Sequence, residues 1–120
     1  MSEYNDKNVF IQIIKKELPC NEVENNENSL SFEDINKQAP VHVLTIPKGK
    51  YTNLESFASN ASNEEIASFI KTIVKSAKNK DLLSSGYRVI INSGSDGNQE
   101  VPHLHAHVLG GKNLGPMIKK

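Results

Sequence analysis

Histidine alternates with apolar residues in the segment VPHLHAHVLGG, which occupies positions 101–111. Successive side chains of a β-strand point to opposite faces of its sheet. A strand through this segment therefore presents three imidazoles on one face: His103, His105 and His107. Its other face is apolar: Leu104, Ala106 and Val108. We expect the apolar face to pack on a helix and the imidazoles to face a cleft.

A helix able to cover the apolar face is predicted over residues 62–80. Ser62 and Glu65 have capping-box spacing, which is typical of a helix N-terminus. Apolar side chains then recur at helical period along one stripe: Ile66, Phe69, Ile70, Ile73, Val74 and Ala77. We interpret this stripe as core packing rather than as a ligand site.

Shorter elements complete the fold prediction. Turn residues and apolar patterns indicate a short amphipathic helix over residues 8–19, a hairpin over 23–35, and strands over 41–47 and 87–92. Because most connections are short, we expect antiparallel pairing, with residues 87–92 beside the histidine strand. The prediction is one α+β domain spanning residues 1–120. It consists of an antiparallel meander sheet of about five strands with one long helix and a short N-terminal helix.

Charge and composition exclude several classes of partner. The chain has 14 basic and 14 acidic residues, so it carries no excess positive charge that would attract nucleic acid or anionic lipid. Cys20 is the single cysteine, which excludes an internal disulfide framework and fits a reducing compartment. No signal peptide and no apolar run of membrane-spanning length are evident. We expect a soluble, cytoplasmic protein with no nucleic-acid or membrane partner.

Three hypotheses address the clustered histidines. They are polar residues on a solvated strand face, ligands of an open catalytic metal site, or a nucleophile with neighbouring imidazoles that orient it and donate protons. Three of only four histidines fall at this spacing, which argues against the first hypothesis. The glycine-containing turn at residues 92–100 is either an ordinary hairpin or a nest of backbone N–H groups that binds an anion. Directly before a histidine strand, it favours a phosphate cradle beside a nucleophile.

Several segments resemble the histidine triad (HIT) family, and in particular its Hint branch of purine nucleoside phosphoramidases. The segments are FIQIIKKELP, FEDINKQAPVHVLTIPKGK, GYRVIINSGSDGNQEVPHLHAHVLGG and the ending LGPM. The resemblance implies a cofactor-free, metal-free hydrolase of adenosine or guanosine 5'-phosphoramidates. AMP or GMP would be released through a covalent nucleotidyl-histidine.

The resemblance also implies residue roles. His105 would be the nucleophile, His107 would hydrogen-bond a phosphate oxygen, His103 would fix the geometry behind the nucleophile, and His42 would be an additional active-site histidine. Asp34 would hold the ribose hydroxyls. Apolar residues would wall the purine pocket: Ile35, Phe10, Ile13 and Phe32. The ribose and phosphate would be contacted by Asn92 and by the backbone around Asn98, Gln99 and Glu100.

Two departures from the family pattern bear on the leaving group and the phosphate loop. Glu100 stands where animal members have a serine that is thought to assist the leaving amine, and Asn98 replaces a glycine. The ending GPMIKK also lacks the tryptophan of animal members. The resemblance further implies a homodimer whose sheets join edge to edge through the central strand and the long helix. A nucleotide-binding regulatory protein with vestigial activity and a zinc-dependent hydrolase remain the alternative functions.

Overall fold

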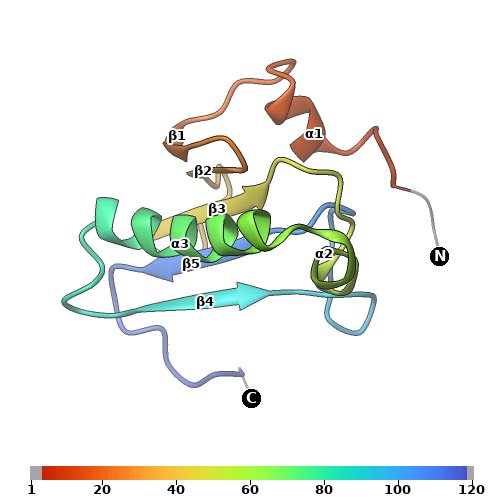
Figure 1. Ribbon diagram of the computed structural model, residues 1–120. Helices are drawn as coiled ribbons and strands as arrows, with labels where there is room; N and C mark the ends of the chain where they lie inside the picture. The colour runs from red at the N-terminus through yellow and green to blue at the C-terminus, as the bar shows by residue number, and fades with distance from the viewer. Residues whose placement is uncertain (1–3, 119–120) are drawn as a thin grey trace.

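The computed structural model describes residues 4–118 and is built on one antiparallel sheet (Figure 1). The strands are β1 (Glu22–Asn25), β2 (Ser29–Glu33), β3 (Val41–Pro47), β4 (Tyr87–Ile91) and β5 (Ala106–Gly110). Their order across the sheet is β1-β2-β3-β5-β4, and every neighbouring pair is antiparallel. The α+β class, the five strands and the pairing of β4 with β5 confirm the prediction. The order departs from a simple meander because β5 inserts between β3 and β4.

Three helices flank this sheet: α1 (Val9–Ile14), α2 (Leu54–Asn60) and α3 (Asn63–Asn79). The capping box of α3 is confirmed, since Glu65 N donates to Ser62 Oγ and Ser62 N donates to Glu65 Oε1. Helix α1 is shorter than predicted. It is capped at Lys15, and the next residue, Lys16, takes a left-handed φ of 63°, which ends the helix before Pro19.

Helix α2 was not predicted. Its N-terminus is an Asn53–Ser56 capping box, in which Ser56 N donates to Asn53 Oδ1 and Asn53 N donates to Ser56 Oγ. Asn and Ser three residues apart are a weaker signal than the Ser and Glu of α3. The following seven residues also carry only one buried side chain, Phe57, so they show little helical periodicity.

Helix α3 covers one face of the sheet and forms the main core. The buried members of this core include Val43, Phe57, Phe69, Ile73, Ala77, Leu104, Ala106 and Val108. The predicted stripe is only partly buried, because Ile70 is 54% exposed and Val74 is 43% exposed. The interpretation of these two residues as core was therefore wrong. Helix α3 packs mainly on β1, β2, β3 and β5.

A second, smaller core lies on the opposite face, under α1. It contains Phe10, Leu30, Phe32, Leu44 and Ile46. Leu44 follows Val43 along β3, so the two side chains point to opposite faces and separate the two cores. Within residues 4–118, no helix has the length and apolar character that crossing a bilayer requires.

Candidate active site

A cavity of about 680 Å³ opens on the α1 face of the sheet. One part of its wall is apolar and includes Phe10, Ile13, Leu18 and Phe32. The other part is polar and includes Asp34, His42, Asn92, Asn98, Glu100, His105 and His107. The cavity therefore combines an apolar end with a set of imidazole and carboxylate groups, as small-molecule sites typically do.

The histidine segment enters the sheet later than predicted. Strand β5 begins at Ala106, so His103 lies in a bend, His105 lies in the irregular segment between that bend and the strand, and only His107 lies in the strand. The alternation still holds, because Leu104, Ala106 and Val108 all belong to the core under α3. The predicted common orientation of the histidines is visible in their contacts. The rings of His105 and His107 meet edge to face at 5.1 Å, and Phe10 contacts both His103 and His105.

His103 does not face the cavity, which corrects the expectation that all three imidazoles do so. Its side chain is fully buried, covered by Tyr4 and Phe10. Its Nε2 lies 2.8 Å from the backbone oxygen of Pro47. Burial lowers the pKa of His103 to about 4, so the ring is neutral near pH 7.

The hydrogen bonds of His105 fix which ring nitrogen carries its proton. Nδ1 lies 2.8 Å from the backbone oxygen of His103, and a carbonyl oxygen can only accept. Nδ1 is therefore the protonated nitrogen of the neutral ring, and Nε2 holds the lone pair. His105 is only 6% exposed, and its burial lowers its pKa, which keeps that lone pair unprotonated at neutral pH. A neutral imidazole with a free Nε2 at the cavity wall is a competent nucleophile.

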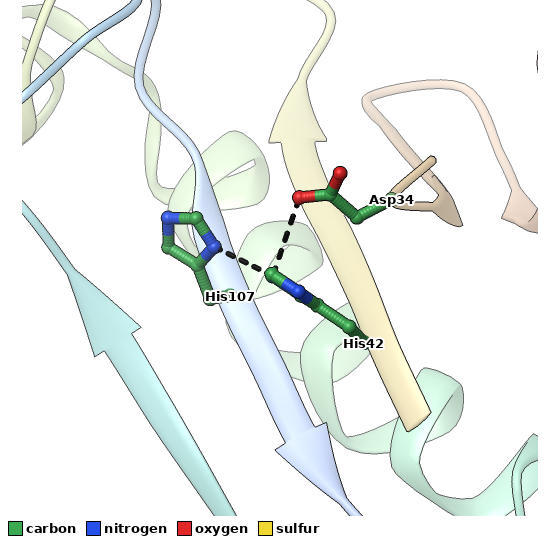
Figure 2. Close-up of side chains that lie close together, drawn as sticks. All are labelled: Asp34, His42 and His107. Atoms are coloured by element: carbon green, nitrogen blue, oxygen red, sulfur yellow. Dashed lines mark hydrogen bonds and ion pairs between the residues drawn. The ribbon is translucent and has the colours of Figure 1, made fainter. Parts of the chain in front are cut away.

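His42 connects Asp34 to His107 (Figure 2). Gln38 N donates to His42 Nδ1 at 3.1 Å, so the proton of the neutral His42 ring is on Nε2. That Nε2–H lies 2.9 Å from His107 Nδ1 and 3.3 Å from Asp34 Oδ2. Burial lowers the pKa of His42, and the charge of Asp34 opposes the shift only in part. The contact with Asp34 is therefore that of a carboxylate beside a neutral ring, whose one N–H is given to His107, rather than an ion pair.

The same logic sets the proton of His107. Its Nδ1 accepts from His42, so its own proton is on Nε2. Burial, with the neighbouring His105 and His42, lowers the pKa of His107 to about 4. A neutral His107 thus offers an N–H donor from β5, next to the lone pair of His105. Asp34 is held at its other oxygen by Asn36 N, at 2.8 Å.

Most of the residues expected to contact nucleotide line this cavity: Phe10, Ile13, Phe32, Asp34, Ile35, Asn92, Asn98 and Glu100. Gln99 does not, because its side chain turns away and donates to the backbone oxygens of Thr52 and Val101. Ile35 is 91% exposed, so it stands at the rim rather than in the core.

The turn at residues 92–100 is closed by its own hydrogen bonds. The backbone N–H groups of Asn98 and Gln99 donate to the oxygens of Ser95 and Gly94. These two amides are therefore not free to form the predicted anion nest. Asn98 has a φ of 60°, a left-handed conformation that glycine and asparagine adopt most readily, so asparagine fits where the resemblance implies a glycine.

Two contributions to the site were missed by the sequence analysis. The Gln38 backbone N–H sets the tautomer of His42, and backbone donors leave no trace in residue type. Cys20, which the sequence indicated only as an unpaired cysteine, lines the cavity and packs on the smaller core.

Asp34, His42 and His107 form the group best placed to hold a metal ion within residues 4–118. One potential ligand atom from each residue lies within 4.8 Å of the others. The hydrogen bonds oppose that use. A metal-bound histidine normally donates its second ring N–H to an acceptor. His42 Nδ1 instead faces the N–H of Gln38, so Nε2 keeps its proton and cannot bind a metal.

Comparison with known proteins identifies the family. The model of the HIT domain matches residues 15–114. The chain belongs to the HIT domain family, and its α+β fold is that of the family's solved structures. One of these, a HIT family hydrolase from Clostridium thermocellum, superposes with a TM-score of 0.84 at 36% identity, over 96% of this chain and 99% of that one.

Some of the relatives carry functional names. The purine nucleoside phosphoramidase of Escherichia coli (strain K12) is 34% identical over 113 residues, which cover 94% of each chain. A 14 kDa zinc-binding protein of Zea mays is 41% identical over 106 residues, which cover 88% of this chain and 83% of that protein. The chain is thus similar to a phosphoramidase and to a protein named for binding zinc.

Proposed function

We propose that this protein hydrolyses adenosine and guanosine 5'-phosphoramidates through a covalent intermediate on His105. The observation that carries the proposal is the bond from His105 Nδ1–H to the oxygen of His103, because it leaves Nε2 as a neutral nucleophile at the cavity wall. The relative named as a purine nucleoside phosphoramidase supports the choice of substrate.

The reaction has two steps. His105 Nε2 attacks the α-phosphorus, the P–N bond breaks, and the amine departs with the electron pair and takes a proton. Water then attacks the phosphorus of the nucleotidyl-histidine and loses a proton, and the bond to His105 breaks to release AMP or GMP. In both steps His107 Nε2–H donates to a phosphoryl oxygen and stabilises the charge that develops there. His42 holds the ring of His107 in the tautomer that makes this donation possible.

The nucleoside is held mainly by its base and sugar. The purine lies against Phe10, Ile13, Phe32 and Ile35, and the carboxylate of Asp34 accepts from the ribose hydroxyls. Among the residues that the structure describes, no Lys or Arg lines the cavity, whereas Glu33, Asp34 and Glu100 do. The phosphate group is therefore bound by neutral N–H donors rather than by cationic side chains. A phosphate ion alone binds weakly to such donors, so the nucleoside supplies most of the binding free energy.

A zinc-dependent hydrolase is the second candidate, favoured by the cluster of Asp34, His42 and His107 and by the name of the Zea mays relative. The tautomer of His42 argues against it. A regulatory nucleotide-binding protein would use the same cavity without turnover.

The proposal includes a homodimer. Strand β3, the central strand of the protomer, is paired on both sides and so cannot join two sheets. Strand β4 lies at an edge of the sheet, where it can pair with a strand of another protomer. Val89 is opposite Val108 and therefore lies on the α3 face of β4. Val89 is exposed there, as are Ile70 and Val74 of α3. Pairing β4 with the same strand of a second copy extends the sheet and covers these side chains.

One turnover assay separates the candidate functions. Purified protein is incubated with an adenosine 5'-phosphoramidate, with and without a chelator, and release of AMP is followed. The proposal predicts AMP release that the chelator leaves unchanged. Loss of activity with the chelator supports the zinc enzyme, and nucleotide binding without turnover supports the regulatory protein.

A further inference from the structure

The N-terminal segment at residues 4–8 lies against the buried side of the histidine cluster. The Tyr4 hydroxyl hydrogen-bonds His103 Nδ1, and the two rings meet edge to face at 5.6 Å with an interplanar angle of 77°. Asn8 Nδ2 donates to the same hydroxyl at 2.8 Å. An ion pair of 2.7 Å between Lys50 and Asp6 fastens the segment to the loop after β3. Nothing in the proposed chemistry so far uses Tyr4.

The direction of each hydrogen bond in this group is determined. Asn8 Oδ1 accepts from Ile11 N as the cap of α1, so its Nδ2 is the atom that faces Tyr4 and donates. The Tyr4 oxygen thus accepts from Asn8 and gives its own proton to His103 Nδ1. His103 Nε2–H in turn donates to the oxygen of Pro47 at 2.8 Å. One neutral tautomer of His103 satisfies both of its neighbours.

The His103 residue is also the support of the nucleophile. Its backbone oxygen accepts from His105 Nδ1 at 2.8 Å, and this bond leaves the lone pair of His105 on Nε2. Because the His103 side chain is fully buried and bonded at both ring nitrogens, its backbone is held at a fixed point. The Tyr4 hydroxyl is one of those two bonds.

We propose that Tyr4 is a positioning residue for His105, acting through His103. Its hydroxyl holds the His103 ring at Nδ1, opposite the bond from Nε2–H to the Pro47 oxygen, and the fixed ring holds the carbonyl that orients the nucleophile. The inference rests on the proposed role of His105 as the nucleophile. Without the hydroxyl, His103 Nδ1 lacks a donor in a buried site, which is unfavourable. The proton stays on Nε2, because only that tautomer can donate to the Pro47 oxygen. The ring is then held on one side alone, and the His103 carbonyl is less well fixed.

The variant Tyr4→Phe tests this, because it keeps the ring that packs on His103 and removes only the hydroxyl. Tyr51→Phe is the matched control. It also removes one part-buried hydroxyl bond, from Tyr51 to Glu65, and Tyr51 does not line the cavity. Both variants are compared with the wild type in thermal unfolding, in AMP affinity, and in kcat and KM for an adenosine phosphoramidate. Imidazole nitrogen NMR reports the protonation and the motion of the His103 and His105 rings.

We expect Tyr4→Phe to lower kcat about tenfold, as loss of an orienting partner typically does, with KM and AMP affinity changed less than about twofold. Tyr51→Phe should keep the wild-type kcat. In NMR both proteins should show His103 protonated at Nε2, but nitrogen relaxation should show a more mobile His103 ring in Tyr4→Phe. Equal kcat in the two variants, or a His103 ring as rigid in Tyr4→Phe as in the wild type, overturns the proposal. If the wild type itself releases no AMP, the proposed function fails, and the NMR comparison still decides whether Tyr4 holds the His103 ring.

Discussion

His42 Nε2 lies 2.9 Å from His107 Nδ1, and the N–H of Gln38 on the far side of the His42 ring fixes the direction of that bond. His42 donates and His107 accepts. His107 consequently presents its only proton, on Nε2, as a donor. The pair connects an ordinary backbone amide in the loop before β3 to the donor that the proposed reaction needs.

This relationship predicts a non-additive pair of substitutions. His107→Ala removes a donor to the phosphoryl oxygens and should lower kcat by about 10²–10³. His42→Ala should lower kcat less, by about tenfold, because it leaves the His107 side chain in place and removes only the hydrogen bond that orients it. The double variant should be no slower than His107→Ala alone, as steady-state kinetics of the three proteins will show. Losses that multiply would mean that His42 acts independently of His107.

Asp34 should contribute to binding through the ribose hydroxyls. Asp34→Asn should weaken AMP binding by about 10- to 100-fold, the range expected for hydrogen bonds to a charged group. Binding of 2',3'-dideoxy-AMP should change little, because that ligand has no hydroxyls to lose. Calorimetric titration of both ligands against both proteins measures the difference. An equal loss for the two ligands would assign Asp34 a structural role.

Buried neutral histidines predict acid instability in a defined window. The pKa of His103 is lowered to about 4 in the folded protein, against about 6.5 in the unfolded chain. Between these values the unfolded state binds more protons, so the free energy of unfolding falls as pH drops below about 6.5. Each such histidine adds a slope approaching 1.4 kcal/mol per pH unit, roughly the free energy of one pKa unit.

Denaturant unfolding between pH 5.5 and 7.5 tests this slope, because the carboxylates remain ionised over that range. His103→Gln should be less stable at pH 7.5 but should show a shallower dependence on pH than the wild type. Stability of the wild type that is flat across the range would contradict the neutral, buried assignment of His103.

The fold was largely readable from local patterns. The alternation at Leu104, Ala106 and Val108 and the capping box at Ser62 and Glu65 each depend on near neighbours, and both are present in the structure. The burial of His103 was not readable. It depends on Tyr4, 99 positions away, and such contacts leave no periodic signal. The exposure of Ile70 and Val74 was missed for a related reason. An apolar stripe indicates which side of a helix is apolar, but not how much of that side the sheet covers.

The free edge of β4 predicts a dimer that one charge disrupts. Val89→Glu places a carboxylate in the apolar surface that β4 and α3 would share, and its burial is unfavourable without a partner. Light scattering after size-exclusion chromatography should give a dimer for the wild type and a monomer for this variant. Glu24→Lys, a charge change on β1 at the opposite edge of the sheet, serves as the control and should remain dimeric. A monomeric wild type would contradict the proposed interface.

Capture of the nucleotidyl intermediate is the direct test of His105 as the nucleophile. His105 is buried, so truncation to alanine would leave a cavity; His105→Asn is the better variant, since its amide can still donate to the His103 oxygen. Wild-type protein is mixed with an adenosine phosphoramidate, quenched, and analysed by peptide mass spectrometry. The account predicts an adenylyl group on the peptide that contains His105, localised to that residue, and no adduct or turnover in His105→Asn despite retained AMP binding. Turnover in the wild type without an adduct, or turnover that persists in His105→Asn, would contradict it.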